Sequence, residues 1–108
     1  MRTILIDPVT QTVTELEFTG NYKKIQETIG CRCFTVVNID GPDQEAIFID
    51  DEGLLKESGH VFKFNDYPLV GKGLIMGCDK EGDSTGTTLS LSSITNQIEW
   101  MGECTFNL

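Results

Sequence analysis

The segment from Phe48 to Asp83 constrains the fold most strongly, because two acidic, glycine-containing turns flank one long apolar run. The first turn is Asp50-Asp51-Glu52-Gly53, and the second begins at Gly77. Glycine and aspartate favour turns because they adopt backbone conformations that most residues resist. The apolar continuity of Leu69 to Met76, between the two turns, predicts one central strand covered on both faces.

Shorter strand patterns recur on both sides of this run. They are rich in β-branched and aromatic residues and are separated by turn residues, as antiparallel strands are. The predicted strands are Thr3–Ile6, Val13–Phe18, Phe34–Ile39, Ala46–Ile49, His60–Phe64 and Glu99–Leu108.

Two further segments have helical spacing. The first, Tyr22–Ile29, ends before Gly30, a common helix terminator, and the second starts after Ser90, a common N-cap. The apolar residues that the second helix places on one face are Leu91, Ile94 and Ile98. Residues 1–108 therefore predict a single α+β domain, with a mostly antiparallel or mixed sheet of five to seven strands and one or two short helices.

The charge of the chain excludes several partners. Seventeen acidic residues against eight basic ones give a net charge of −9 over 108 residues. A negative field of this size repels nucleic acids and anionic membranes, so we expect neither as a direct partner.

The start Met1–Asp7 becomes acidic too early for a signal peptide, and no apolar run approaches a membrane span, which predicts a cytoplasmic protein.

The residues that commonly carry catalysis do not form a recognisable set. His60, the only histidine, lies in a predicted turn with no acid at an informative position. The acidic residues lie beside glycine in predicted exposed turns, which lack the apolar pocket that acid–base catalysis needs. Asp79, Glu81 and Asp83 alternate, but their spacing is not that of a calcium-binding loop. We therefore expect no enzyme activity, no cofactor and no metal.

Gly71-Lys72-Gly73 is the most distinctive local site. In one interpretation the glycines admit a ligand close to the backbone and Lys72 contacts its phosphate. In the other, the glycines mark a strand bulge and Lys72 points to water. Tyr67, an aromatic residue near a predicted strand end, and Arg32, one of the few cations, complete this candidate ligand-binding set.

Several segments together resemble a known domain family. They are the N-terminal hairpin, the helix Tyr22-Lys-Lys-Ile-Gln-Glu-Thr-Ile-Gly, Phe48-Ile-Asp-Asp-Glu-Gly-Leu-Leu-Lys and Pro68-Leu-Val-Gly-Lys-Gly-Leu-Ile-Met-Gly. They are similar to a family of unknown function that bacteriophages and mobile elements commonly encode, and the resemblance runs from about Thr3 to Trp100. It implies a small accessory protein acting in the cytoplasm of the host bacterial cell, and it carries no established catalytic residues.

Two non-enzymatic functions remain open. In the first, a counter-defence factor engages a basic host protein through an acidic rim formed by Asp50, Asp51, Glu52, Asp79, Glu81 and Asp83. In the second, a homo-oligomer traps a small nucleotide signal at Gly71-Lys72-Gly73 without cleaving it. The net charge favours the first function, because it attracts basic surfaces and repels nucleotides.

Overall fold

The computed structural model describes residues 1–19, 22–39, 45–53, 58–78, 81 and 84–106. These residues contain nine strands, one of them only two residues long, and two helices. The strands are β1 (Arg2–Asp7), β2 (Thr12–Glu17), β3 (Phe34–Ile39), β4 (Glu45–Asp50), β5 (Ser58–Phe64), β6 (Tyr67–Val70), β7 (Gly73–Cys78), β8 (Ser84–Thr85) and β9 (Ile98–Thr105). The helices are α1 (Tyr22–Ile29) and α2 (Leu91–Asn96).

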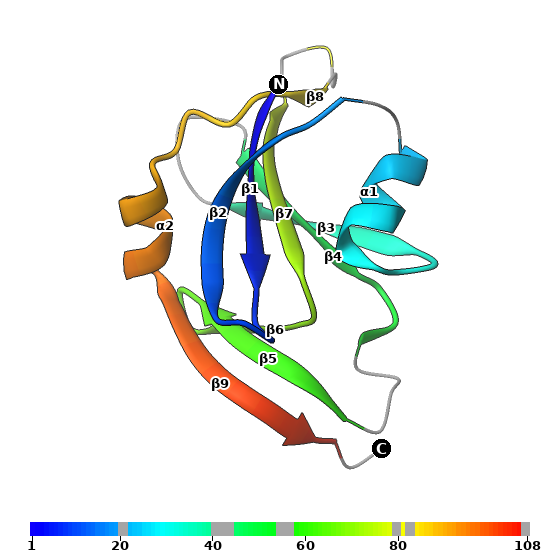
Figure 1. Cartoon of the computed structure of the whole chain (residues 1–108), viewed down its shortest axis with the longest axis vertical. Helices are drawn as coiled ribbons and strands as arrows, with labels where there is room; N and C mark the ends of the chain where they lie inside the picture. Colours follow the sequence, from blue (N-terminus) through cyan, green and yellow to red (C-terminus); the bar gives the residue numbers. More distant parts are fainter. Residues whose placement is uncertain (20–21, 40–44, 54–57, 79–80, 82–83, 107–108) are drawn as a thin grey trace.

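The strands form two antiparallel sheets (Figure 1). The larger sheet has the order β2-β1-β7-β4-β3, with β8 paired to β7, and the smaller sheet has the order β6-β5-β9. The helix α1 lies beside the larger sheet, and α2 leads from the β8 end of the molecule into β9 of the smaller sheet. The predicted α+β class is confirmed, but the described residues form nine strands and not the predicted five to seven, and the strands are divided between two sheets.

The termini of both helices follow from local sequence. The helix α1 ends at Ile29, directly before Gly30, as predicted. The helix α2 begins after Ser90, whose hydroxyl accepts a hydrogen bond from the Ser93 N–H at 3.1 Å. This side-chain bond satisfies one of the backbone donors that the first turn of a helix leaves free. Ile98 was predicted on the helix but starts β9 instead, because α2 ends at Asn96.

The prediction of one central strand from Leu69 to Met76 is wrong. The chain leaves β6 at Val70 and enters β7 at Gly73, so the apolar run belongs to two strands in different sheets. Gly71 lies between them with φ of +87°, a conformation that side-chain-bearing residues rarely adopt. Its N–H donates to the His60 carbonyl at 2.9 Å, which holds the turn against β5.

The two faces of the larger sheet are covered differently. One face packs against the smaller sheet and α2, and its fully buried side chains include Ile4, Ile47, Phe62 and Ile94. The other face packs under α1, with Phe18, Ile25, Ile29, Leu74 and Met76 buried there. No helix in the described part of the chain has the length and apolar character needed to cross a membrane.

Candidate functional site

A groove lies between β3, at one edge of the larger sheet, and β6, at one edge of the smaller sheet. It consists of two adjoining hollows of about 310 and 150 Å³ that share Val37, Tyr67 and Leu69. We call it the β3–β6 groove. Its lining residues are Thr35, Val37, Asn38, Ile39, Ile47, Ile49, Asp50, Asp51, Gly53, Phe64, Asn65, Tyr67, Pro68, Leu69 and Val70. Most of these side chains are apolar, so the groove suits a ligand with apolar groups.

Tyr67 stands out on the wall of this groove because it is 59% exposed. A tyrosine combines a large apolar ring with a polar hydroxyl, and tyrosines are enriched at protein interfaces for that reason. Trp100, an aromatic residue near the start of β9, packs instead against Phe62 with ring centroids 6.3 Å apart. The structure therefore leaves Tyr67 as the exposed aromatic residue on this side.

One end of the β3–β6 groove is acidic. Asp50 and Asp51 line this end, and the Asp50 carboxylate accepts a hydrogen bond from the Glu52 N–H at 2.9 Å. Arg32 pairs with both carboxylate oxygens of Glu52, at 3.1 and 2.7 Å. This hydrogen bonding to Glu52 raises the pKa of the Arg32 guanidinium. Arg32 therefore pairs directly with Glu52 and is also attracted by Asp50, which lines the groove together with Asp51.

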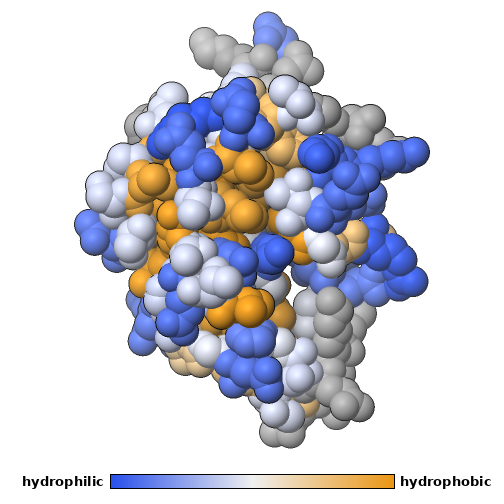
Figure 2. Space-filling model, in the orientation of Figure 1, coloured by the Kyte–Doolittle hydropathy of each residue, from blue (hydrophilic) through white to orange (hydrophobic). Residues whose placement is uncertain are grey.

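A further hollow, of about 350 Å³, surrounds the turn between β6 and β7. We call it the Lys72 pocket. The residues that line it are Val9, Ile29, Gly30, Asp50, Gly53, Ser58, Gly59, His60, Val70, Gly71 and Lys72. Figure 2 shows a hollow on this face near the place of the β6–β7 turn in Figure 1. The pocket contains one lysine and one histidine, but Asp50 also lines it.

The predicted ligand-binding set is not gathered in one place. Gly71 and Lys72 line the Lys72 pocket, whereas Tyr67 lines the β3–β6 groove and Arg32 lies beside Glu52. Gly73 is buried, and a Cβ atom there would lie 3.0 Å from Cγ2 of Ile47. Gly73 therefore permits close packing inside the protein and does not open the backbone to a ligand.

The predicted acidic rim is also divided. Asp50, Asp51 and Glu52 follow one another where β4 ends, whereas Glu81 comes after the end of β7. Because β4 and β7 are antiparallel, with Glu45 opposite Gly77, Glu81 follows the strand end that lies beside the start of β4. A six-residue strand spans roughly 17–20 Å, so Glu81 is not placed beside the other three. Asp79 and Asp83 lie outside the described residues.

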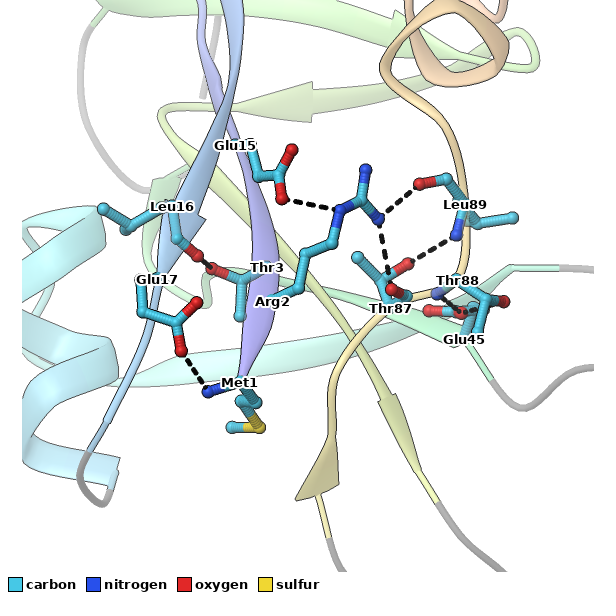
Figure 3. Close-up of polar contacts among 10 residues, drawn as sticks. All are labelled: Met1, Arg2, Thr3, Glu15, Leu16, Glu17, Glu45, Thr87, Thr88 and Leu89. Carbon is cyan, nitrogen blue, oxygen red and sulfur yellow. Dashed lines mark hydrogen bonds and ion pairs between the residues drawn. The ribbon is translucent and has the colours of Figure 1, made fainter.

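Sequence reasoning missed a polar cluster at the start of the chain (Figure 3). The Arg2 side chain donates to a carboxylate oxygen of Glu15 at 2.8 Å and to the carbonyls of Thr87 and Leu89 at 3.1 and 2.6 Å. Arg2 thus ties the segment before α2 to β1 and β2. Thr87 and Leu89 are 85 and 87 residues from Arg2 along the chain, so no local pattern could have revealed these contacts.

Glu45 holds the same segment from the other side (Figure 3). Its Oε1 accepts the Thr88 N–H at 3.0 Å, and the residue is 5% exposed. Its buried Oε2 makes no hydrogen bond within the described residues. Both contacts fasten a loop to the sheet, so we interpret Arg2 and Glu45 as structural residues.

No group of three or more metal-ligating side chains is found in the described ranges.

Comparison with known proteins gives one result. No curated protein and no solved structure matches the chain. The model of one family, described as a domain of unknown function (DUF3846), matches residues 1–99, which is nearly the whole chain. The chain therefore belongs to the DUF3846 family, a family of domains of unknown function.

Proposed function

We propose that this protein is a non-enzymatic binding protein that engages a basic partner protein through the β3–β6 groove. The observation that supports this most directly is an apolar groove with an exposed tyrosine on its wall and two aspartates at one end. Burial of apolar side chains in such a groove supplies affinity, and the acids select a basic partner. The net charge of −9 adds long-range attraction to the same partner.

We further propose that the partner is a host defence protein and that the chain is an accessory, counter-defence product of a phage or mobile element. This part rests on the resemblance of the sequence to domains that such elements encode. It also rests on the charge, because an acidic protein suits a basic surface that normally meets nucleic acid.

The binding proposal is tested by removing the acids of the groove. Bacterial lysate is passed over the immobilised chain at low salt, and the most enriched protein is identified and purified. We expect its affinity to fall as salt is raised, because salt screens charges at an interface rim. We also expect Asp50→Asn combined with Asp51→Asn to weaken binding about fivefold, as loss of two rim charges should.

A matched control removes two charges from the far edge of the same sheet. Glu15→Gln combined with Glu17→Gln changes the net charge equally but alters β2, four strands away from β3. This control should bind within about twofold of the wild type, since screening limits the reach of exposed charges. Equal weakening by both variants would contradict a role for the groove.

A second candidate function is capture of a small anionic ligand, such as a nucleotide signal, in the Lys72 pocket. The observation that favours it is the presence of Lys72 and His60 around one hollow of about 350 Å³. Asp50 lines the same hollow and repels an anion, so we rank this function second. An oligomer is part of this alternative, because the predicted trap is completed by a second subunit.

Incubation with a panel of nucleotides tests the second function. The protein is separated from unbound ligand and denatured, and the released compounds are analysed. A trap returns intact ligand, and Lys72→Ala reduces its recovery while Lys63→Ala does not. Both lysines are partly buried, but Lys63 does not line the pocket. Release of altered ligand would indicate an enzyme, and absence of ligand would exclude both small-molecule functions.

A further inference from the structure

The outer strands of the two sheets, β2, β3, β6 and β9, differ in how they are protected against pairing with another strand. The edge strand β2 carries Glu15 and Glu17, and β6 has only four residues, including Pro68. The strand β9 has a bulge next to Gly102 and carries glutamates. Charges, proline, short length and bulges are the features that prevent strands from pairing edge to edge. Phe34–Ile39, the strand β3, has none of them.

The backbone of β3 presents hydrogen-bonding groups away from β4. The Asp51 N–H donates to the Cys33 carbonyl at 3.1 Å, just before the first residue of β3. This bond shows which alternate residues of β3 form hydrogen bonds with β4. Since bonded positions alternate along such a ladder, Phe34, Val36 and Asn38 direct their N–H and C=O groups to the outer side. Within the described residues, no strand pairs with that side.

The β3–β6 groove adjoins this edge and offers room for side chains. Val37 and Ile39 line the groove from β3, and Tyr67 and Leu69 line it from β6. An extended segment paired with β3 lies about 4.8 Å from it and alternates its side chains between the two faces of the sheet. Every second side chain of such a segment therefore enters the apolar groove.

We propose that the partner binds as an extra strand on the outer edge of β3, through an extended segment that combines alternating apolar residues with a lysine or arginine. This inference rests on the proposed function and specifies its mode. Main-chain bonds to Val36 and Asn38 supply affinity, and the groove supplies specificity, as in other cases of strand addition. The basic residue lies at the groove end lined by Asp50 and Asp51.

Charge identifies a basic segment, and not a second copy of this chain, as the occupant. A second copy brings its own net charge of −9 to an edge that already has two aspartates beside it. Like charges placed across an interface oppose association, whereas a lysine or arginine beside the aspartates favours it.

A library of random twelve-residue peptides tests the proposal without knowledge of the natural partner. Peptides that bind the wild-type chain are selected, sequenced and synthesised, and their affinities are measured by calorimetry. We expect alternating apolar residues together with basic ones. We also expect slower hydrogen exchange at the Val36 and Asn38 amides when a peptide is bound.

Proline substitution removes one outward donor without touching the ladder to β4. Val36→Pro should weaken the selected peptides about tenfold or more, because a hydrogen bond is lost and the ring blocks the incoming strand. Val36→Thr keeps the N–H and is the matched control, which we expect to bind like the wild type. Asn38→Pro removes the next outward donor and replaces Val36→Pro if that variant does not fold.

The peptide provides an independent test that does not depend on folding of a variant. N-methylation at alternate peptide residues blocks only one of its two edges, so one methylated series should lose binding and the other should keep it. Strand addition is overturned if the affinity for the peptides is unchanged by both proline variants and by both methylated series. The proposed function is judged separately by the Asp50 and Asp51 variants. Strand addition by a basic segment is also overturned if no peptide is selected and the chain forms a dimer that Val36→Pro abolishes. That result assigns the edge to a second copy.

Discussion

The two edges of the larger sheet differ in the contacts that surround them. At the β2 edge, Arg2 bonds to Glu15 and to two backbone carbonyls of the segment before α2, so distant parts of the chain are fastened together (Figure 3). Neither β2 nor β3 has a further strand on its outer side within the described residues, but β3 borders the β3–β6 groove. Polar groups that are bonded within the chain contribute to stability, whereas groups left facing a groove are available to a partner. Substitutions should therefore separate the two regions by their effects.

The largest effect on stability should come from the fastened region. Ile94 of α2 is fully buried against the larger sheet, and Ile94→Ala should lower the free energy of unfolding by about 3 kcal/mol through lost burial and the cavity left behind. Denaturant unfolding measures this loss. Val9→Ala, at a residue 60% exposed, is the control and should change stability by less than about 0.5 kcal/mol. A loss at Ile94 no larger than at Val9 would show that α2 is not fastened.

Removal of the Arg2 head group should have an intermediate effect. Arg2→Met keeps the aliphatic stem but loses the bonds to the Thr87 and Leu89 carbonyls, at a cost of about 1–2 kcal/mol. Thermal melting measures the loss, and peptide affinity at β3 should not change. The control Lys24→Met removes an exposed lysine whose partner Glu27 is 4.0 Å away, and such pairs contribute little. Weaker peptide binding by Arg2→Met would link the two edges.

The smallest effect on stability should come from the open region. Tyr67→Ala should change the free energy of unfolding by less than about 0.5 kcal/mol, because the side chain is 59% exposed. The same change should weaken binding of the selected peptides about tenfold, as loss of an aromatic anchor does. Met101→Ala, at a residue 41% exposed on β9, is the control and should preserve both properties. Unchanged binding by Tyr67→Ala would place the contact surface elsewhere.

Much of the fold could be predicted from local sequence because its signals are local. Gly30 ends α1 and Ser90 begins α2 as their residue types suggest. The prediction of a single strand from Leu69 to Met76 was wrong because two buried strands in different sheets have the same apolar pattern as one buried strand. The positive φ of Gly71, which separates them, is permitted by glycine but not required by it.

The candidate site could not be predicted for the same reason, because it arises from the separation of β6 and β7. The β3–β6 groove exists only because β6 leaves the path of β7 and lies near β3, a strand about 30 residues earlier in the chain. Pairing over such distances depends on the whole packed structure and not on residues close together in sequence. The acidic turn after β4 could be identified from sequence, but its position at one end of a groove could not.

The position of β7 in the larger sheet has a consequence for how the protein is made. Its two N-terminal hairpins, β1–β2 and β3–β4, are local in sequence, but β7 lies between them in the sheet order. During synthesis each hairpin can form as soon as it emerges, yet the sheet cannot be joined until residues 73–78 are free to insert. Contacts between distant residues slow folding, so we expect the nascent chain to expose apolar strands for most of its synthesis.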